Sequence, residues 1–172
     1  MVIWIIGMPG AGKTAVGALL YKQISSDYKN TVFIDGDDIR NIMLNDLGHT
    51  IEDRKINATR IRNFCKHLDK QNINIVCSIM SIFQEDRDWN RENYESYYEV
   101  FLNTPLEILI TRDQKGLYSK AYDNQIKDVV GVDIPFNSPI NPDLIINNDP
   151  KIINLQQITE TIYDAIQKQL SK

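Results

Sequence analysis

Residues 2–14 read V-I-W-I-I-G-M-P-G-A-G-K-T, an apolar run typical of a buried strand that leads directly into a glycine-rich loop. The loop has the spacing G-x-x-x-x-G-K-[ST] of a phosphate-binding loop, in the strand-then-helix context that such a loop requires. Glycines let backbone N–H groups approach phosphate oxygens, and the start of a helix adds further N–H groups and a positive dipole end. This junction predicts that the chain binds a nucleoside triphosphate.

The residue types in the loop also predict its cofactors. Lys13 supplies a positive charge toward the β- and γ-phosphates, and the Thr14 hydroxyl suits Mg²⁺ as a ligand. We therefore expect ATP and Mg²⁺, with Lys13 as a catalytic residue and Thr14 as the metal ligand. The residues expected to contact ATP here are Gly7, Met8, Pro9, Gly10, Ala11, Gly12, Lys13 and Thr14. A glycine-rich turn without function is the alternative, and it leaves the Lys-Thr pair unexplained.

The composition is that of an ordinary globular chain and excludes several classes of function. Of the 172 residues, 42% are hydrophobic and 24% are charged, with a net charge of −4. This acidic balance argues against general binding to nucleic-acid polymers or anionic membranes, because both need a basic face. No apolar run approaches the length of a transmembrane helix. We expect a cytoplasmic enzyme with one domain over residues 1–172, and two reduced, buried thiols at Cys65 and Cys77.

Apolar runs alternate with longer amphipathic stretches along the chain, the pattern of a parallel sheet flanked by helices. The predicted fold class is α/β, a doubly wound five-stranded parallel sheet with helices on both faces. The expected strands are 2–6, 31–35, 74–79, 97–103 and 143–147. The expected helices are 13–25, 37–45, 51–71, 87–94, 106–112 and 155–170.

A long stretch rich in glycine and proline, about residues 112–142, separates the last two predicted elements of the sheet. Irregular segments of this length inside a compact domain are usually functional, and we expect a lid. Arg112 and Lys115 stand at its edge, where they could close over the triphosphate and neutralise developing charge. An ordinary charged helix end is the alternative for both residues.

An acidic segment, Asp35-Gly36-Asp37-Asp38-Ile39-Arg40, follows the second predicted strand. In a doubly wound sheet the carboxyl end of a strand beside the phosphate loop faces the active crevice. Carboxylates there can act through water on Mg²⁺ or accept a proton from an attacking hydroxyl, and Arg40 would share a helical face with Asp37. A solvated turn with a helix N-cap is the alternative.

Another polar segment opens the predicted helix 51–71, with Thr50 as its N-cap. Arg54, Asn57 and Arg60 recur every three residues along one face of that helix. Three such side chains could grip a phosphate-like group, and solvated surface charges are the alternative. For His49, a lone histidine before the helix, a surface or packing role is the alternative to catalysis.

Taken in order, these motifs resemble those of the adenylylsulfate kinases. After the phosphate loop the chain carries D-G-D-x-x-R, L-G-x-[ST]-x-E-D-R-x-x-N, S-x-x-x-E-D-R-D, R-D-x-K-G-L-Y-x-K-A and I-K-x-x-x-G-x-D-x-P-[FY]-x-x-P, and the resemblance covers about residues 3–147. The K-G-L-Y block is far more specific than a phosphate loop alone. The resemblance implies a P-loop kinase fold, ATP, Mg²⁺ and a homodimer. It also implies transfer of a phosphoryl group to the ribose 3′-hydroxyl of a nucleotide with a modified 5′ phosphate.

The resemblance also implies roles for individual residues. Asp37 matches the position that contacts and deprotonates the 3′-hydroxyl, and Arg112 and Lys115 match lid residues near the nucleotides. Ser81 matches a serine that we expect to contact the substrate at most, because in-line transfer needs no covalent enzyme intermediate. The residues expected to bind the acceptor are Asp35, Asp37, Arg40, His49, Arg54, Asn57, Ser81, Lys127 and Val129.

Departures from the family pattern cluster on the acceptor side. His49 and Val129 replace the two phenylalanines that flank the adenine of the acceptor, and stacking on an aromatic ring contributes roughly 1–3 kcal/mol per base. Val130, Gln84 and Ile134 replace a threonine, an arginine and an aspartate. The pattern predicts retained chemistry with a changed acceptor.

A smaller pyrimidine needs less stacking area, and His49 could stack on it or donate a hydrogen bond to it. The cytidine diphosphoramidate kinases of capsule-modification pathways resemble this chain in having an altered base pocket, and this resemblance alone makes cytidine diphosphoramidate the preferred acceptor. Adenylylsulfate is the alternative acceptor. A nucleotide-binding regulator without catalysis is the alternative of another class, and the presence of Lys13, Thr14 and Asp37 argues against it.

Overall fold

The predicted strands form one parallel sheet in a computed structural model that describes residues 1–113 and 116–170. The strands are β1 Val2–Ile6, β2 Thr31–Asp35, β3 Asn74–Ile79, β4 Tyr97–Asn103 and β5 Leu144–Asn147. They lie in the order β2-β3-β1-β4-β5, and every neighbouring pair is parallel. The predicted five-stranded parallel sheet is confirmed, and only β5 starts one residue later than expected.

The helices are α1 Lys13–Asp27, α2 Gly36–Ile42, α3 Ile51–Asp69, α4 Gln84–Asn93, α5 Leu106–Arg112, α6 Leu117–Tyr122 and α7 Leu155–Leu170. Helix α2 ends earlier than predicted, because Leu44 and Asn45 adopt positive φ angles of 58° and 53°. Helix α6 lies in the stretch predicted to be irregular. The Asp113 carboxylate accepts hydrogen bonds from the N–H groups of Tyr118 and Ser119, which stabilises the start of this short helix.

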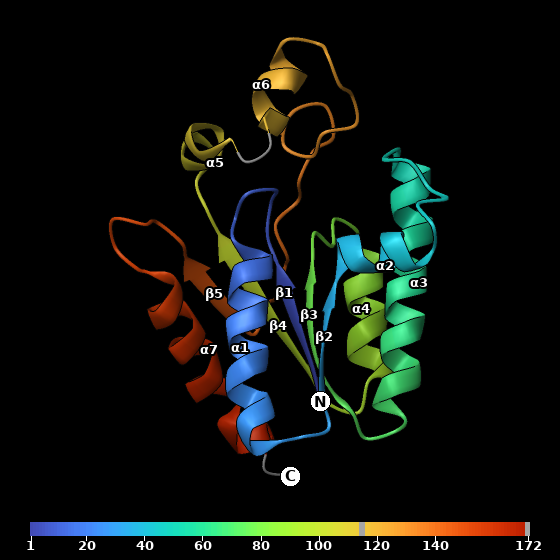
Figure 1. Ribbon diagram of the computed structural model, residues 1–172, viewed down its shortest axis with the longest axis vertical. Helices are drawn as coiled ribbons and strands as arrows, with labels where there is room; N and C mark the ends of the chain where they lie inside the picture. The colour runs from blue at the N-terminus through green and yellow to red at the C-terminus, as the bar shows by residue number, and fades with distance from the viewer. Residues whose placement is uncertain (114–115, 171–172) are drawn as a thin grey trace.

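Alternate residues of β1 pack into two different cores, one on each face of the sheet. Ile3 and Ile5 pack with α1 and α7, whereas Val2, Trp4 and Ile6 pack with apolar residues of α2 and α3. Figure 1 shows this arrangement, with α1 and α7 on one side of the strands and α3 and α4 on the other. Burial on both faces explains why the strand reads as a continuous apolar run.

Helix α1 packs very closely on the neighbouring strands at one glycine. A Cβ atom built on Gly17 would lie 2.2 Å from Ser78 Oγ and 2.6 Å from Phe33 Cε2.

In the core on the other face of the sheet, Cys65 and Cys77 are buried free thiols, as predicted. Burial raises the pKa of Cys77 well above its ordinary value.

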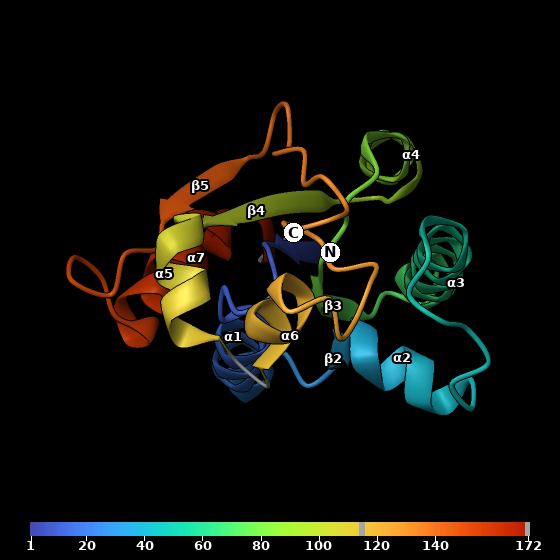
Figure 2. The same ribbon diagram turned by 90° about the horizontal axis from the view of Figure 1, so that it is seen from above.

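The carboxyl ends of the strands meet at one edge of the molecule, as parallel strands must. In Figure 1 that edge is at the top, and α5, α6 and the chain after α6 lie above it. Figure 2 looks down on the same edge, with α6 over the end of the sheet and α2 at one side. Within the described ranges, no helix has the length and apolar character needed to cross a membrane.

Candidate active site

The phosphate loop, residues 7–14, adopts a backbone conformation that its glycines make possible. Gly10 and Gly12 have φ angles of 79° and 85°, in the left-handed region that glycine enters without steric cost. Gly12 is the N-cap of α1, and Lys13 is the first residue of that helix. The predicted junction between a central strand and a helix is therefore present, with β1 ending at Ile6.

Lys13 connects the loop to the acidic segment. Its Nζ donates a hydrogen bond of 2.9 Å to the carbonyl oxygen of Met8, across the loop. Desolvation lowers the pKa of Lys13 to about 8, against the opposing effect of the Asp35 and Asp37 carboxylates. Lys13, which is expected to bind the triphosphate, and Asp37, which is expected to bind the acceptor, therefore lie close enough for their charges to interact.

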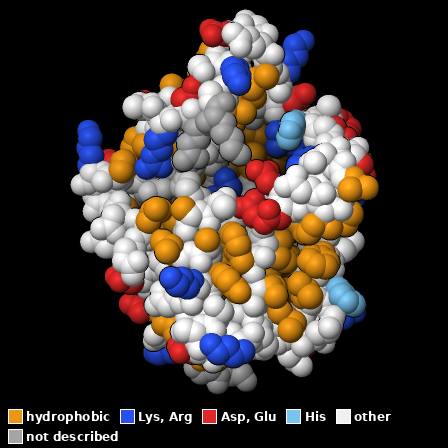
Figure 3. All heavy atoms as spheres, viewed as in Figure 1, with side chains coloured by type: hydrophobic (Ala, Val, Ile, Leu, Met, Phe, Trp, Pro, Cys, Tyr) orange, Lys and Arg blue, Asp and Glu red, His pale blue; other side chains and the backbone are white. Residues whose placement is uncertain are grey.

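Asp35 links Thr14 to helix α2 through its two carboxylate oxygens. Thr14 Oγ1 donates a hydrogen bond of 2.7 Å to Asp35 Oδ2, and the Asp37 N–H donates one of 2.9 Å to Asp35 Oδ1. Asp35 is therefore the N-cap of α2. The N-cap interpretation of the acidic segment is therefore confirmed, and its role at the active site stays a prediction. Figure 3 shows acidic side chains gathered near the middle of this face, with basic side chains just above them.

The side chains in the crevice suit Mg²⁺ bound mainly through phosphates and water. In residues 1–113 and 116–170, no three His, Cys, Asp or Glu side chains come together as a metal cluster. Mg²⁺ usually takes one or two carboxylates, keeps several waters and binds substrate phosphates. The Thr14 hydroxyl and the Asp35 carboxylate, which are in direct contact, fit this requirement.

Arg40 lies on the acceptor side and holds the chain that follows α2. One of its terminal nitrogens donates hydrogen bonds of 3.3 Å and 2.8 Å to the carbonyl oxygens of Leu47 and Gly48. These contacts fold the segment before α3 back toward α2. Thr50 then caps α3 by accepting a hydrogen bond of 3.2 Å from the Asp53 N–H, as predicted.

Arg54 joins two segments that are distant in the sequence. Its Nε donates a hydrogen bond of 2.8 Å to the carbonyl oxygen of His49, and a terminal nitrogen donates one of 2.7 Å to the carbonyl oxygen of Asp128. Val129, the neighbour of Asp128, is buried and donates its N–H to the Asp133 carboxylate. His49 and Val129, which replace the two phenylalanines of the family pattern, are therefore connected through the guanidinium group of Arg54.

Positive charge accumulates on this side of the crevice. Burial and the charge of Arg40 lower the pKa of Arg54, and burial together with both arginines lowers the pKa of His49. Neither arginine is among the salt bridges of the described residues. Two guanidinium groups held by carbonyl oxygens keep their charge available for an anion.

The predicted stripe on α3 divides into two parts. Asn57 is only 7% exposed, and its Oδ1 has no hydrogen-bond partner among the described residues. Arg60 instead makes a bidentate ion pair with Asp46, at 2.7 Å and 2.8 Å. The surface alternative therefore holds for Arg60, while Arg54 and Asn57 remain acceptor-side candidates.

The other residues that the sequence analysis singled out on the acceptor side and in the lid are placed as follows. Ser81 is buried, and its Oγ accepts a hydrogen bond of 3.1 Å from Trp4 Nε1. Gln84, at the position of the family arginine, uses its Oε1 to accept hydrogen bonds of 3.2 Å and 2.7 Å from Arg87. Lys127 is exposed, and Lys115 lies outside the described residues.

Side chains from beyond β4 donate hydrogen bonds to carbonyl oxygens of the phosphate loop. Arg112 donates a hydrogen bond of 3.2 Å to the carbonyl oxygen of Gly10, and the Tyr118 hydroxyl donates one of 2.9 Å to that of Pro9. Asn148, directly after β5, donates one of 2.7 Å to the carbonyl oxygen of Ala11. Tyr118 and Asn148 were not predicted to be site residues. The signal for Asn148 was its place at the carboxyl end of a strand.

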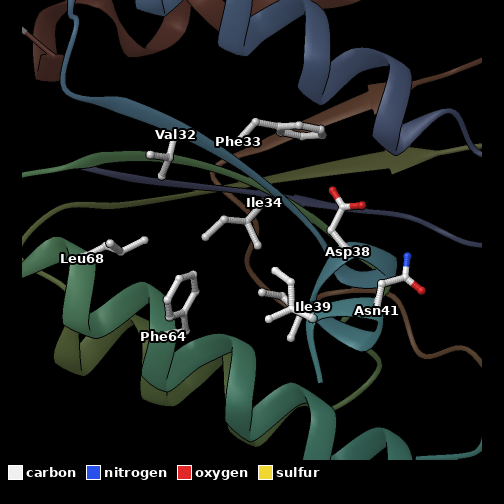
Figure 4. A pocket seen from close by; sticks show the side chains of 9 residues that line it. Val32, Phe33, Ile34, Asp38, Ile39, Asn41, Phe64 and Leu68 are labelled. Carbon is white, nitrogen blue, oxygen red and sulfur yellow. The ribbon is translucent and has the colours of Figure 1, made fainter. Parts of the chain in front are cut away.

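A separate apolar groove of about 510 Å³ lies behind α2, between β2 and α3. Figure 4 shows Ile34, Phe64 and Leu68 around it, with Asp38 and Asn41 at its α2 end. Its lining contains no Lys or Arg. The groove therefore lacks the cationic groups that a triphosphate needs, and the crevice above the strands remains the candidate site.

These features define a P-loop nucleotide-binding fold of the kinase class. They are a parallel sheet, a phosphate loop after its central strand, a lysine on that loop and carboxylates beside it. A family model described as adenylylsulphate kinase matches residues 1–147, and the chain belongs to this family. It is a phosphotransferase with a hydroxyl group as acceptor, and it binds small-molecule nucleotides.

Individual relatives agree with this assignment. A cytidine diphosphoramidate kinase from Campylobacter jejuni is 40% identical over 164 residues, 94% of this chain and 93% of that protein. An adenylyl-sulfate kinase from Thermodesulfovibrio yellowstonii is 35% identical over 169 residues, 96% of this chain and 84% of that protein. The solved structure of Mycobacterium tuberculosis APS kinase CysC in complex with AMPPNP and APS has a TM-score of 0.87 at 28% identity, and the match covers 96% of each chain.

Proposed function

We propose that this kinase transfers the γ-phosphoryl group of ATP to the ribose 3′-hydroxyl of cytidine diphosphoramidate. The observation that carries the proposal is that Asp35 and Asp37 are retained beside the phosphate loop, whereas His49 and Val129 stand where the family has the two phenylalanines that flank the adenine. The 40% identity to a cytidine diphosphoramidate kinase supports the same acceptor.

ATP binds in the phosphate loop, with its β- and γ-phosphates on the backbone N–H groups. Lys13 exchanges the carbonyl oxygen of Met8 for phosphate oxygens, and its charge favours the triphosphate. Thr14 and Asp35 would hold Mg²⁺, which when bound neutralises charge on the β- and γ-phosphates. The sequence therefore contains every residue that this proposal requires for binding ATP and Mg²⁺.

Asp37 orients the attacking 3′-hydroxyl and accepts its proton late in a loose transition state. The new bond joins the 3′-oxygen to the γ-phosphorus, the bond from that phosphorus to the β,γ-bridging oxygen breaks, and ADP leaves. The proximity of Asp37 to Lys13 supports this role, because the carboxylate must stand next to the transferred group.

Arg40 and Arg54 bind the anionic 5′ end of the acceptor, together with Asn57. The absence of a direct salt bridge to either arginine among the described residues, and the unpaired Oδ1 of the buried Asn57, support this role. His49 and Val129 lie beside the base, where cytosine needs less stacking area than adenine. Positioning of the two substrates is the main contribution that an enzyme makes to this kind of transfer.

The segment 112–142 forms the lid in this proposal and excludes water that would otherwise hydrolyse ATP. The contacts of Arg112 and Tyr118 with the phosphate loop support it. We also propose that residues 1–172 form one domain and that two copies associate. Sedimentation equilibrium of the purified protein would test that association.

An adenylylsulfate kinase is the second candidate, favoured by the 35% identical relative and by the structural match to a protein solved with APS. A regulator without catalysis is disfavoured because Lys13, Thr14 and Asp37 are all present and adjacent. Formation of a 3′-phosphorylated product from any acceptor would exclude the regulator.

The deciding experiment measures ADP release by a coupled assay, with cytidine diphosphoramidate and adenylylsulfate offered separately at equal concentration. A strong preference for the cytidine compound supports the proposal. A strong preference for adenylylsulfate overturns it and shows that the adenine is held without the two aromatic rings. Release of ADP that does not depend on either compound would be hydrolysis of ATP by water and would support neither acceptor.

A further inference from the structure

Four consecutive carbonyl oxygens of the phosphate loop each accept a hydrogen bond from a side chain. Lys13 Nζ, from the end of the loop itself, donates to Met8 at 2.9 Å. The other donors come from distant parts of the chain: the Tyr118 hydroxyl to Pro9, Arg112 to Gly10 and Asn148 Nδ2 to Ala11, at 2.9, 3.2 and 2.7 Å. These contacts restrict the rotation of the peptide units in the loop.

The orientation of a carbonyl group decides where the next N–H group points. In a trans peptide unit the C=O and the following N–H point in opposite directions. Tyr118 therefore sets the direction of the Gly10 N–H through the carbonyl of Pro9, and Asn148 sets that of the Gly12 N–H through the carbonyl of Ala11. Loop N–H groups are what a phosphate-binding loop offers to its ligand.

Tyr118 and Asn148 differ from the other two donors in charge and burial. Lys13 and Arg112 are cations, so the phosphates of a nucleotide compete with the carbonyl oxygens for them. Tyr118 is 1% exposed and Asn148 is 4% exposed, and both are neutral. Burial raises the pKa of Tyr118 to about 12, so its hydroxyl keeps the proton that it donates.

Asn148 is itself held in place. Its Nδ2 also donates a hydrogen bond of 3.1 Å to Thr104 Oγ1, so the amide is fixed between the loop after β4 and the phosphate loop. Tyr118 is supported by Asp113, which accepts its backbone N–H at 2.7 Å. Each residue is thus oriented by a partner that lies outside the phosphate loop.

We propose that Tyr118 and Asn148 are positioning residues that preorganise the phosphate loop for a triphosphate. They hold the peptide units 9–10 and 11–12 with the N–H groups of Gly10 and Gly12 turned toward the ligand. The inference rests on the proposed function only in that the ligand of the loop is ATP. It requires no assumption about the acceptor.

The test is calorimetric titration of Mg-ATP, and separately of inorganic triphosphate, into Tyr118→Phe and Asn148→Ala without any acceptor. Each variant removes one hydrogen bond to the phosphate loop, and Asn148→Ala also removes the one to Thr104. The Kd for ATP should therefore rise roughly 3- to 10-fold. Inorganic triphosphate should lose affinity by the same factor, because the loop contacts only phosphates. The matched controls are Tyr122→Phe on the exposed side of α6 and Asn147→Ala at the exposed end of β5, which should stay within about twofold of the wild type.

Melting temperatures of the same variants separate positioning from stability. A lower melting temperature with an unchanged Kd for ATP in both variants would mean that the two residues only support the fold, and it would overturn the inference. Equal affinity in all five proteins would overturn it as well. If Tyr118→Phe does not fold, Asn148→Ala decides the question. Failure of the wild type to bind ATP would contradict the proposed function instead.

Discussion

Thr14 and Asp35 are in direct contact, with the threonine hydroxyl 2.7 Å from the aspartate carboxylate. The other oxygen of the same carboxylate accepts the backbone N–H of Asp37. One side chain thus joins the residue proposed to hold Mg²⁺ to the start of the helix that carries the proposed base. A single carboxylate therefore contacts both the phosphate loop and the start of α2.

The first prediction concerns Asp37. Asp37→Asn should bind ATP nearly as well as the wild type, while turnover falls at least ~100-fold, in the range expected for the loss of a general base. Asp38→Asn is the matched control, because Asp38 lines the apolar groove on the other side of α2. Steady-state turnover and ATP titration give both quantities. Equal turnover in the two variants would remove Asp37 from the role of base.

The second prediction follows from the lowered pKa of Lys13, about 8 in the protein without nucleotide. Bound phosphates favour the charged lysine, so ATP binding above pH 8 should take up a proton and weaken as the pH rises. Calorimetry in two buffers with different ionisation enthalpies measures this uptake. Lys13→Arg keeps its charge at these pH values and should not take up the proton. An absence of proton uptake at pH 9 in the wild type would contradict the assignment.

The third prediction tests the base region. His49→Phe, alone and combined with Val129→Phe, should raise kcat/KM for adenylylsulfate, because an aromatic ring contributes roughly 1–3 kcal/mol of stacking. His49 is exposed, so the single variant should keep the wild-type melting temperature. Val129 is buried, and the melting temperature of the double variant must be checked. No gain in either variant would show that these positions do not face the base.

The fourth prediction concerns the bridge made by Arg54. Arg54→Lys keeps the charge but cannot reach both His49 and Asp128 with a rigid fork, so the KM for the acceptor should rise about 10-fold. The KM for ATP should not change. Arg60→Lys serves as the control, because Arg60 pairs with Asp46 at the surface. A parallel loss in both variants would indicate a general effect of charge on α3.

The fifth prediction concerns stability. In an exposed helix Ala is favoured over Gly by about 1 kcal/mol. Gly17→Ala should nevertheless lower the free energy of unfolding by ~1–3 kcal/mol, because the new Cβ would overlap Ser78 and Phe33. Urea denaturation measures this change. An increase in stability would show that α1 can move away from β2 and β3 without cost.

The strands were predictable because a central parallel strand is buried on both faces and reads as an uninterrupted apolar run. The bounds of β1, β2, β3 and β4 agree with the prediction for this reason. The end of α2 was not predictable, because it depends on the left-handed conformation of Leu44, which is uncommon for leucine. The next left-handed residue, Asn45, is of a type that adopts this conformation more readily. Helix α6 escaped detection because it is short and because Asp113, whose carboxylate accepts N–H groups of its first turn, lies four residues before Leu117.

The site was predictable where motifs are local in the sequence. The phosphate loop and the acidic segment come together because strand order places β1 and β2 on either side of β3. Contacts between distant residues could not be predicted in the same way. Tyr118 and Pro9 are 109 positions apart, and Asn148 and Ala11 are 137 positions apart. Only the folded chain shows that these pairs meet.

The way in which Arg40 and Arg54 are held has a thermodynamic consequence. Carbonyl oxygens orient a guanidinium group without cancelling its charge, so the two arginines repel each other and His49, against the opposing effect of Asp37 and Asp128. An anionic acceptor removes that repulsion when it binds. By linkage, the acceptor should then raise the melting temperature of the protein, and the segments around residues 47–49 and 128 should gain the most protection against amide exchange. We therefore expect binding of the acceptor and stabilisation of these two segments to occur together.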